Sequence, residues 1–168
     1  MITFSNSYFT INTDNSTYQM KIDQYGILIH LYYGQRAEGE MDYLLNVFDR
    51  GFSGNVNDTG PDRTYSMDEI MGEYPTRGTG DFRSPVFDVR YEDSSWGTDL
   101  RFRDYKITDG KYALKGLPAV YAADEDEAQT LEILMEDKTT GLEVSLLYGV
   151  LPKLDIITRA VVVKNNGS

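Results

Sequence analysis

The sequence predicts an all-β fold, a two-layer antiparallel sandwich with little helix. Thirteen tyrosines, seven phenylalanines and many Val and Ile residues stand in short runs between turn residues, which is the composition of strands. Within these runs apolar and polar residues alternate with a period of two, as at residues 18–22. The turn signals between the runs recur at the spacing that is typical of a sandwich.

The first predicted hairpin covers residues 18–33. Tyr18, Met20 and Ile22 alternate with polar residues, residues 23–26 offer a turn, and residues 27–33 form a nearly continuous apolar strand. Further strands are predicted at residues 86–91, 100–107 and 119–121, with a turn at Asp109 and Gly110.

Residues 122–138 are ambiguous, because their summed propensity favours a helix. Leu131, Ile133 and Met135 nevertheless alternate with other residues, and the alternation resumes at residues 142–148. We therefore predict a second hairpin that turns at residues 138–141 and follows an acidic loop. The only helix predicted is a single turn after Ser66, where Glu69 stands at capping-box spacing.

The last predicted strand covers residues 156–163 and is followed by turn residues at 165–167. An edge strand without a neighbour is usually covered in natural proteins, so we expect further polypeptide after this end. The alternative is a natural terminus with a frayed tail. The expected organisation is one β-sandwich domain over residues 1–168.

Charge and composition exclude several classes of partner. The chain has 27 acidic and 16 basic residues, and its net charge of -11 repels nucleic-acid phosphates and anionic lipids. It has no cysteine and one histidine, His30, so neither a metal site nor a cofactor is predicted. With no basic leader and no membrane-length apolar run, we expect a cytoplasmic chain without a membrane partner.

Residues 50–85 form the most informative stretch. They hold six of the fifteen glycines and three of the five prolines, together with several aromatic residues and methionines. Long loops in compact domains are usually either functional or disordered, and these apolar anchors favour an ordered, packed loop.

The basic residues around this loop are all arginines, with no lysine between Lys21 and Lys106. The arginine fork suits bidentate contacts with carboxylates or with vicinal hydroxyl groups. Two alternatives stay open for the loop arginines, ion pairs within the loop or contacts with a ligand, and they concern Arg50, Arg63, Arg77 and Arg83.

Other site chemistry is weakly indicated. Carboxylate pairs arise by chance among so many acids, so they do not indicate a glycosidase site in this chain. Gly78 and Gly80 are followed neither by a helix start nor by a P-loop lysine. Trp96 stands in a turn, either as a loop anchor or as a platform on which a sugar stacks.

Seven short motifs occur in a familiar order. They are YYG at 32–34, FDRGFS at 48–53, DRTYS at 62–66, EYP at 73–75, GDFRSP at 80–85, LKGLPA at 114–119 and TLEI at 130–133. In this order they resemble the N-terminal domain of family 36 glycoside hydrolases, the bacterial α-galactosidases. The resemblance covers nearly the whole chain.

The resemblance implies a β-supersandwich like that of galactose mutarotase, followed by a catalytic (β/α)8 barrel. The whole enzyme would be a retaining α-galactosidase of α-1,6-galactosides such as melibiose and raffinose, with both catalytic aspartates on the barrel. This chain would therefore hold no catalytic residue and would be inactive alone. Its expected role is to support a homo-oligomer, a tetramer in some members, and to extend a loop into a neighbouring subunit's substrate pocket. The residues that match the family's loop are Asp49 and Arg63.

Two other functions are consistent with the residues. A free-standing carbohydrate-binding module would use Trp96 and the tyrosines as its platform. A purely structural oligomerisation domain would pair Asp49 with Arg63 internally.

Overall fold

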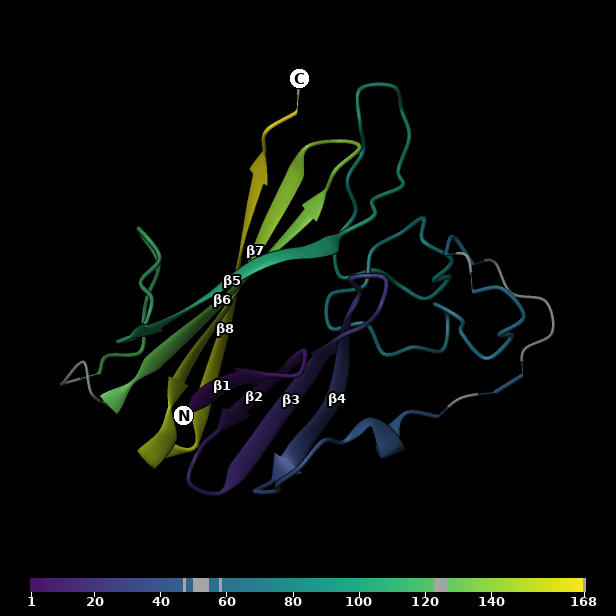
Figure 1. Ribbon diagram of the computed structural model, residues 1–168. Coiled ribbons are helices and arrows are strands. Elements are labelled where there is room, and N and C mark those ends of the chain that lie inside the picture. Colours follow the sequence, from purple (N-terminus) through teal and green to yellow (C-terminus); the bar gives the residue numbers. More distant parts are fainter. Residues whose placement is uncertain (47, 50–54, 58, 123–126, 168) are drawn as a thin grey trace.

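A computed structural model describes residues 1–46, 48–49, 55–57, 59–122 and 127–167. Two antiparallel sheets of four strands each make up the fold, in the strand orders β1-β2-β3-β4 and β5-β6-β7-β8 (Figure 1). The predicted all-β sandwich is confirmed. The regular helical structure among the described residues is short 3₁₀ turns, such as η1 (Asp42–Leu44) and η3 (Pro152–Leu154).

The first sheet is a meander of short hairpins. Its strands are β1 (Ile2–Ser5), β2 (Tyr8–Asn12), β3 (Ser16–Ile22) and β4 (Leu28–Gln35). The β3–β4 hairpin is the one predicted at residues 18–33, whereas β1 and β2 were not predicted. Asn6 and Ser7 join them with φ of 50° and 72°, a left-handed pair that usually carries glycine, so the sequence gives no strong turn signal there.

The second sheet has longer strands, β5 (Arg101–Asp109), β6 (Gln129–Asp137), β7 (Leu142–Leu151) and β8 (Ile156–Asn165). The hairpin predicted from alternation, against the helix propensity of residues 122–138, is confirmed from residue 129. There β6 and β7 pair in an unbroken register from Gln129↔Val150 to Asp137↔Leu142. Residues 123–126 of the predicted acidic loop lie outside the described residues.

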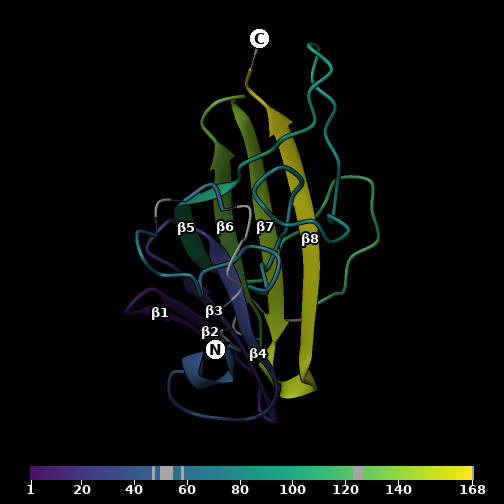
Figure 2. The same ribbon diagram turned by 90° about the vertical axis from the view of Figure 1, so that its right-hand side faces the viewer.

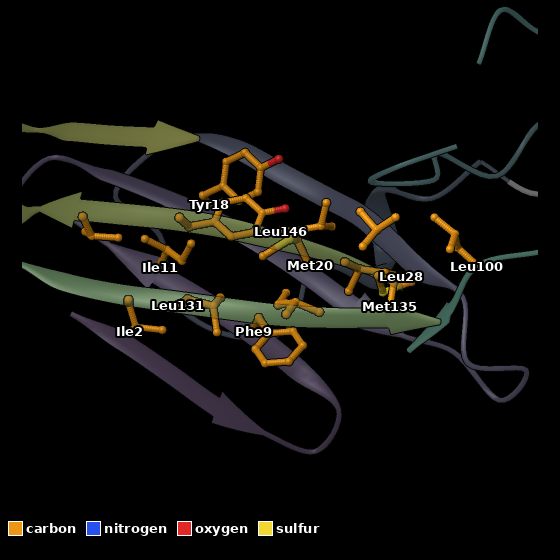
Figure 3. Close-up of a cluster of buried hydrophobic side chains, with 14 of the residues drawn as sticks. Ile2, Phe9, Ile11, Tyr18, Met20, Leu28, Leu100, Leu131, Met135 and Leu146 are labelled. Atoms are coloured by element: carbon orange, nitrogen blue, oxygen red, sulfur yellow. The ribbon is translucent and has the colours of Figure 1, made fainter. Parts of the chain in front are cut away.

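The main core fills the space between the sheets (Figure 3). Phe9, Ile11 and Met20 from the first sheet meet Leu131 and Leu146 from the second, and all five are at most 2% exposed. Cross-strand partners share a face of a sheet, so alternate residues of these strands enter the core while the others face outward.

The long segment after β4 runs along the β4 side of the sandwich (Figures 1 and 2). Its buried Met41 and Met67 cover the outer face of β4, where they pack in a second cluster with Ile29 and Leu31. Gly72 forms an isolated antiparallel bridge with Ile29, so this segment also covers the free edge of β4. The expectation of an ordered, packed loop is confirmed for its described residues.

Two predicted strands are wrong. Within residues 86–91, Phe87 and Val89 pack against the core while Val86 is exposed, so the alternation is real, but the segment forms no ladder. Alternation decides which side chains face inward, whereas a strand also needs a pairing partner. Residues 119–121 are exposed, and they pair with none of the described strands. After Ser66 the chain makes a turn, in which Ile70 N donates to the Ser66 carbonyl at 3.0 Å, but no regular helix.

Candidate functional site

The two residues singled out by the resemblance lie together. Arg63 Nε is 3.0 Å from Asp49 Oδ1, and the side chains are 60% and 64% exposed. The contact joins two segments that are separate in sequence, the stretch after η1 and the loop that follows residue 59. Sequence proximity placed Arg63 beside Asp62, but its ion-pair partner is Asp49.

A compact turn positions Arg63. The Asp62 carboxylate accepts hydrogen bonds from Thr64 N at 2.8 Å and Thr64 Oγ1 at 2.6 Å, and these bonds lower the pKa of Asp62. Such Asx turns are intrinsic to Asp followed two residues later by a donor. Tyr65 then anchors the loop, because its hydroxyl donates to Asp23 Oδ2 at 2.5 Å in the β3–β4 turn.

The segment that leads to Asp49 is held on the outer face of the first sheet. Asp42 accepts a hydrogen bond from Lys21 Nζ at 2.8 Å and another from the Tyr8 hydroxyl. Burial by itself raises the pKa of Asp42, but these two donors more than offset it, so the pKa lies below its ordinary value. The neighbouring Met41 is 2% exposed and donates its N–H to Gln19 Oε1 at 2.9 Å.

A cleft of about 340 Å³ lies between the two segments that carry the pair. Its wall includes apolar side chains from β4, η1 and the loop, and polar groups from the turns on either side. The lining residues are Lys21, Asp23, Gln24, Ile29, His30, Leu31, Leu44, Leu45, Asn46, Asp62, Thr64, Tyr65, Glu69, Ile70 and Met71. Asp62 and Thr64, which flank Arg63, belong to this lining, so the ion pair stands close to the cleft.

The other loop arginines hold the loop together. Arg77 contacts both oxygens of Asp88, at 2.7 and 3.1 Å. Arg83 contacts both oxygens of Asp81, at 2.9 and 2.7 Å, and also donates to the Met67 and Ile70 carbonyls. Of the two alternatives for Arg77 and Arg83, ion pairs within the loop or contacts with a ligand, the structure shows the ion pairs.

Arg50 lies outside the described residues. Trp96 is 45% exposed, with the Arg90 guanidinium carbon 6.0 Å from its ring centre. Trp96 is therefore no buried anchor, and a cation–π contact holds its ring at the surface.

Sequence reasoning missed a buried polar cluster around Glu73. Its carboxylate, whose side chain is 2% exposed, accepts hydrogen bonds from the hydroxyls of Tyr18 and Tyr148 at 2.7 Å. It also lies 3.2 Å from His30 Nδ1 and 2.6 Å from Arg159 Nη2. These partners come from β3, β4, β7 and β8, so Glu73 ties its segment to both sheets.

The pKa of Glu73 reflects two opposing effects. Burial alone would raise it, but the hydrogen bond with His30 and the charge of Arg159, with the two tyrosine hydroxyls, outweigh burial and lower it. Burial together with the Glu73 charge raises the pKa of Tyr148 well above its ordinary value. The cluster therefore holds an ionised carboxylate between neutral tyrosines.

No group of three or more His, Asp or Glu residues among those described is placed to hold a metal ion. Within the same described part of the chain, no helix is long and apolar enough to cross a membrane. The Asp49–Arg63 pair thus stands as the candidate site. A carboxylate beside a guanidinium offers hydrogen-bond acceptors and donors to adjacent hydroxyl groups.

Comparison with known proteins gives a consistent result. Residues 26–168 match the glycosyl hydrolase family 36 N-terminal domain. The chain is 52% identical over 160 residues to the bifunctional α-galactosidase/sucrose kinase AgaSK of Mediterraneibacter gnavus, a match that covers 95% of this chain and 17% of that protein.

Solved structures agree with the sequence match. The galactosidase domain of AgaSK superimposes with a TM-score of 0.94 at 49% identity, covering all of this chain and 24% of that one. A raffinose complex of a variant of AgaA, an α-galactosidase from Geobacillus stearothermophilus, superimposes with a TM-score of 0.88 at 38% identity, covering 95% of this chain and 22% of that one. The chain spans less than a quarter of the length of these relatives. By sequence and by fold, it belongs to the N-terminal domain family of the family 36 α-galactosidases.

Proposed function

We propose that this chain is a non-catalytic part of an α-galactosidase that completes the substrate pocket of a neighbouring subunit. In the whole protein it precedes a catalytic (β/α)8 barrel, and it supports assembly of a homo-oligomer. Asp49 and Arg63 bind hydroxyl groups of an α-galactoside such as raffinose and orient it without reacting. The observation that carries the proposal is the 64% and 60% exposure of the Asp49 and Arg63 side chains, the two residues matched by the family's loop motifs. Their ion pair by itself is also what a purely structural oligomerisation domain would show.

The form of the pair supports this role. Both side chains are more than half exposed, and surface ion pairs of this kind contribute only about 0 to 1 kcal/mol. Little free energy is therefore lost when the pair rearranges around a ligand. Burial of the pair between subunits would exclude water and so strengthen its hydrogen bonds to sugar hydroxyls.

The test uses a hybrid enzyme in which residues 1–168 replace the matching segment of AgaSK. We expect Asp49→Ala and Arg63→Ala to lower kcat/KM for raffinose by about one to two decades, since a charged hydrogen bond contributes roughly 1.5 to 3 kcal/mol. Arg77→Ala is the matched control, because Arg77 is also an exposed loop arginine in an ion pair. Equal effects of Arg63→Ala and Arg77→Ala would contradict the proposed binding role.

Subunit exchange tests the action on a neighbour. A hybrid with Arg63→Ala is mixed with a hybrid that lacks its barrel nucleophile. Mixed oligomers should recover activity, because one interface then combines an intact loop with an intact barrel. Activity that stays at background, with mixed oligomers shown to form, would leave Arg63 as a residue that serves only its own chain.

The alternative function is a free-standing carbohydrate-binding module, favoured by the 45% exposure of Trp96. The isolated chain distinguishes the two functions when galactose, raffinose and longer glycans are titrated and chemical shifts are followed by NMR. A module binds unaided with shifts at Trp96, whereas a loop that completes a neighbouring pocket shows no saturable shift. The isolated chain should also leave a chromogenic α-galactoside uncleaved.

A further inference from the structure

Arg101, the first residue of β5, contacts three separate segments of the chain. Its guanidinium donates to the Tyr25 carbonyl and to Asn57 Oδ1, both at 3.0 Å. It also donates to both carboxylate oxygens of Asp99, at 2.6 and 3.0 Å. Tyr25 lies in the turn between β3 and β4, and Asn57 lies in the long segment after β4. One side chain of the second sheet thus holds a turn of the first sheet and a part of the long segment.

The geometry of this contact is strict. The Arg101 side chain is 19% exposed, and its planar fork is aligned by the two bonds to Asp99, so the direction of Nη1 is fixed. Asn57 Nδ2 is buried and has no hydrogen-bond partner among the described residues. The bond from Arg101 to Asn57 Oδ1 is therefore the contact that orients the Asn57 amide.

The segment at Asn57 is tied to the loop that carries Arg63. Asn55 Oδ1 accepts a hydrogen bond from Asn57 N at 2.9 Å, and Asn55 Nδ2 donates to the Tyr65 carbonyl at 3.2 Å. Tyr65 stands two residues after Arg63. A continuous chain of hydrogen bonds thus leads from Arg101 to the immediate neighbourhood of Arg63.

A second route reaches the same loop through Tyr25, whose carbonyl Arg101 binds. The rings of Tyr25 and Tyr65 pack edge to face, with 4.9 Å between their centres. Burial and the hydrogen bond to Asp23 raise the pKa of Tyr65, and the charge of Arg101 acts in the opposite direction. Arg101 is therefore close enough to act on Tyr65 electrostatically as well as through the hydrogen-bond chain.

We propose that Arg101 is a positioning residue for substrate binding by the Asp49–Arg63 pair. It fixes the segments at Asn57 and Tyr65, and through them the place of the pair. The pair needs such support because its side chains are 64% and 60% exposed, and an exposed ion pair contributes little to holding a loop. The inference rests on the proposed function of the pair.

Hydrogen exchange on the AgaSK hybrid, followed by mass spectrometry, tests the hold on the loop. Arg101→Ala should speed exchange in peptides that contain Asn57 or Tyr65 by about tenfold, because their anchors are released. Peptides of β6 are the internal control and should exchange as in the parent hybrid. Unchanged exchange at Asn57 and Tyr65 would overturn the proposal.

Arg103→Ala is the matched control variant. Arg103 is also an ion-paired arginine of β5, but its partners Glu136 and Glu143 belong to the second sheet. Its removal should leave the exchange of the Asn57 and Tyr65 peptides unchanged. Equal acceleration by Arg101→Ala and Arg103→Ala would show general loosening and overturn the specific role of Arg101.

Kinetics with raffinose test the consequence for binding. Arg101→Ala should raise KM by about three- to tenfold and change kcat by less than about twofold, since it displaces a binding group. In a hybrid that already carries Asp49→Ala and Arg63→Ala, Arg101→Ala should change KM by less than about twofold, because residues that act through one site are not additive. An equal rise of KM in both backgrounds would show that Arg101 acts elsewhere.

Two further variants separate geometry from folding and from charge. Asn57→Ala leaves the contacts of Arg101 with Asp99 and Tyr25 intact, so it tests the proposal even where Arg101→Ala does not fold. It should raise KM in the same direction. Arg101→Lys keeps the charge but replaces the fork by one ammonium, so it should raise KM too. A wild-type KM for either variant would overturn the proposal.

Failure of this inference differs from failure of the proposed function. A rise of KM with Asp49→Ala and Arg63→Ala, but not with Arg101→Ala, would leave the pair as the binding group and remove Arg101 as its positioning residue. An unchanged KM with the two pair variants would overturn the proposed function and with it the role of Arg101 in binding. The exchange experiment would then still report on the hold of Arg101 on the loop.

Discussion

Removal of the Glu73 carboxylate should destabilise the sandwich more than removal of any exposed acid. Glu73→Ala leaves the Tyr18 and Tyr148 hydroxyls without their acceptor, and a buried unsatisfied polar group costs about 1 to 3 kcal/mol. Arg159 also loses its partner, but it is 48% exposed and can turn to water, so its loss counts for less.

The expected loss for Glu73→Ala is about 3 to 5 kcal/mol, the range for breaking a buried ion pair from one side. For a chain of this size it lowers Tm by roughly 6 to 20 °C. Glu73→Gln keeps the shape and one acceptor oxygen, so we expect about 1 to 3 kcal/mol.

The Gln variant also predicts a pH dependence. Because the folded-state pKa of Glu73 is lowered, the ionised carboxylate stabilises the fold above the unfolded pKa of about 4.3. This contribution is lost as pH falls through the lower folded-state pKa. The difference in unfolding free energy between the wild type and Glu73→Gln should therefore be constant near pH 7 and shrink below about pH 4.

Urea denaturation at a series of pH values measures both effects. Glu40→Gln is the control, because Glu40 is exposed and the substitution removes the same single negative charge. The reasoning fails if Glu73→Gln and Glu40→Gln cost the same at pH 7. It also fails if the Glu73→Gln difference does not shrink in acid.

Three further substitutions have definite expected outcomes. Tyr65→Phe removes the hydroxyl bonded to Asp23 and should cost about 1 to 2 kcal/mol in urea denaturation; no loss would mean that this bond does not anchor the loop. Gly141→Ala should lower the unfolding free energy more than Gly39→Ala. Both glycines have positive φ, but only at Gly141 would an added Cβ meet backbone, 2.9 Å from the Gly167 nitrogen; equal losses would refute the close approach. Trp96→Ala should change the unfolding free energy by less than about 1 kcal/mol, and a larger loss by calorimetry would restore its role as an anchor.

Local patterns predicted the strands whose alternation and turn chemistry agree. The β3–β4 and β6–β7 hairpins were found because Asp23 to Gly26 and Lys138 to Gly141 separate alternating runs. The β1–β2 hairpin was missed, because Asn6 and Ser7 adopt a conformation that the residue types signal weakly.

Long-range polar contacts could not be predicted from local patterns. Glu73 stands four residues before Arg77, yet its guanidinium partner is Arg159 on the last strand. Its tyrosine partners are 55 and 75 residues away. Only the packing of the two sheets brings these groups together, and no sequence spacing encodes that packing.

The arginines of the loop divide by the burial of their partners, and this division explains why Arg63 differs from its neighbours. The Asp81 side chain, bound by Arg83, is 5% exposed, so releasing Arg83 would strand a buried carboxylate. The Asp49 side chain is 64% exposed, so Arg63 can leave it for a ligand at little cost. Arg83 and Arg77 make bidentate contacts that fix the loop, whereas the Arg63 and Asp49 side chains, which meet at 3.0 Å between Nε and Oδ1, are 60% and 64% exposed. The loop thus presents one exposed pair on an otherwise fixed framework, which is the arrangement that the proposed binding role requires.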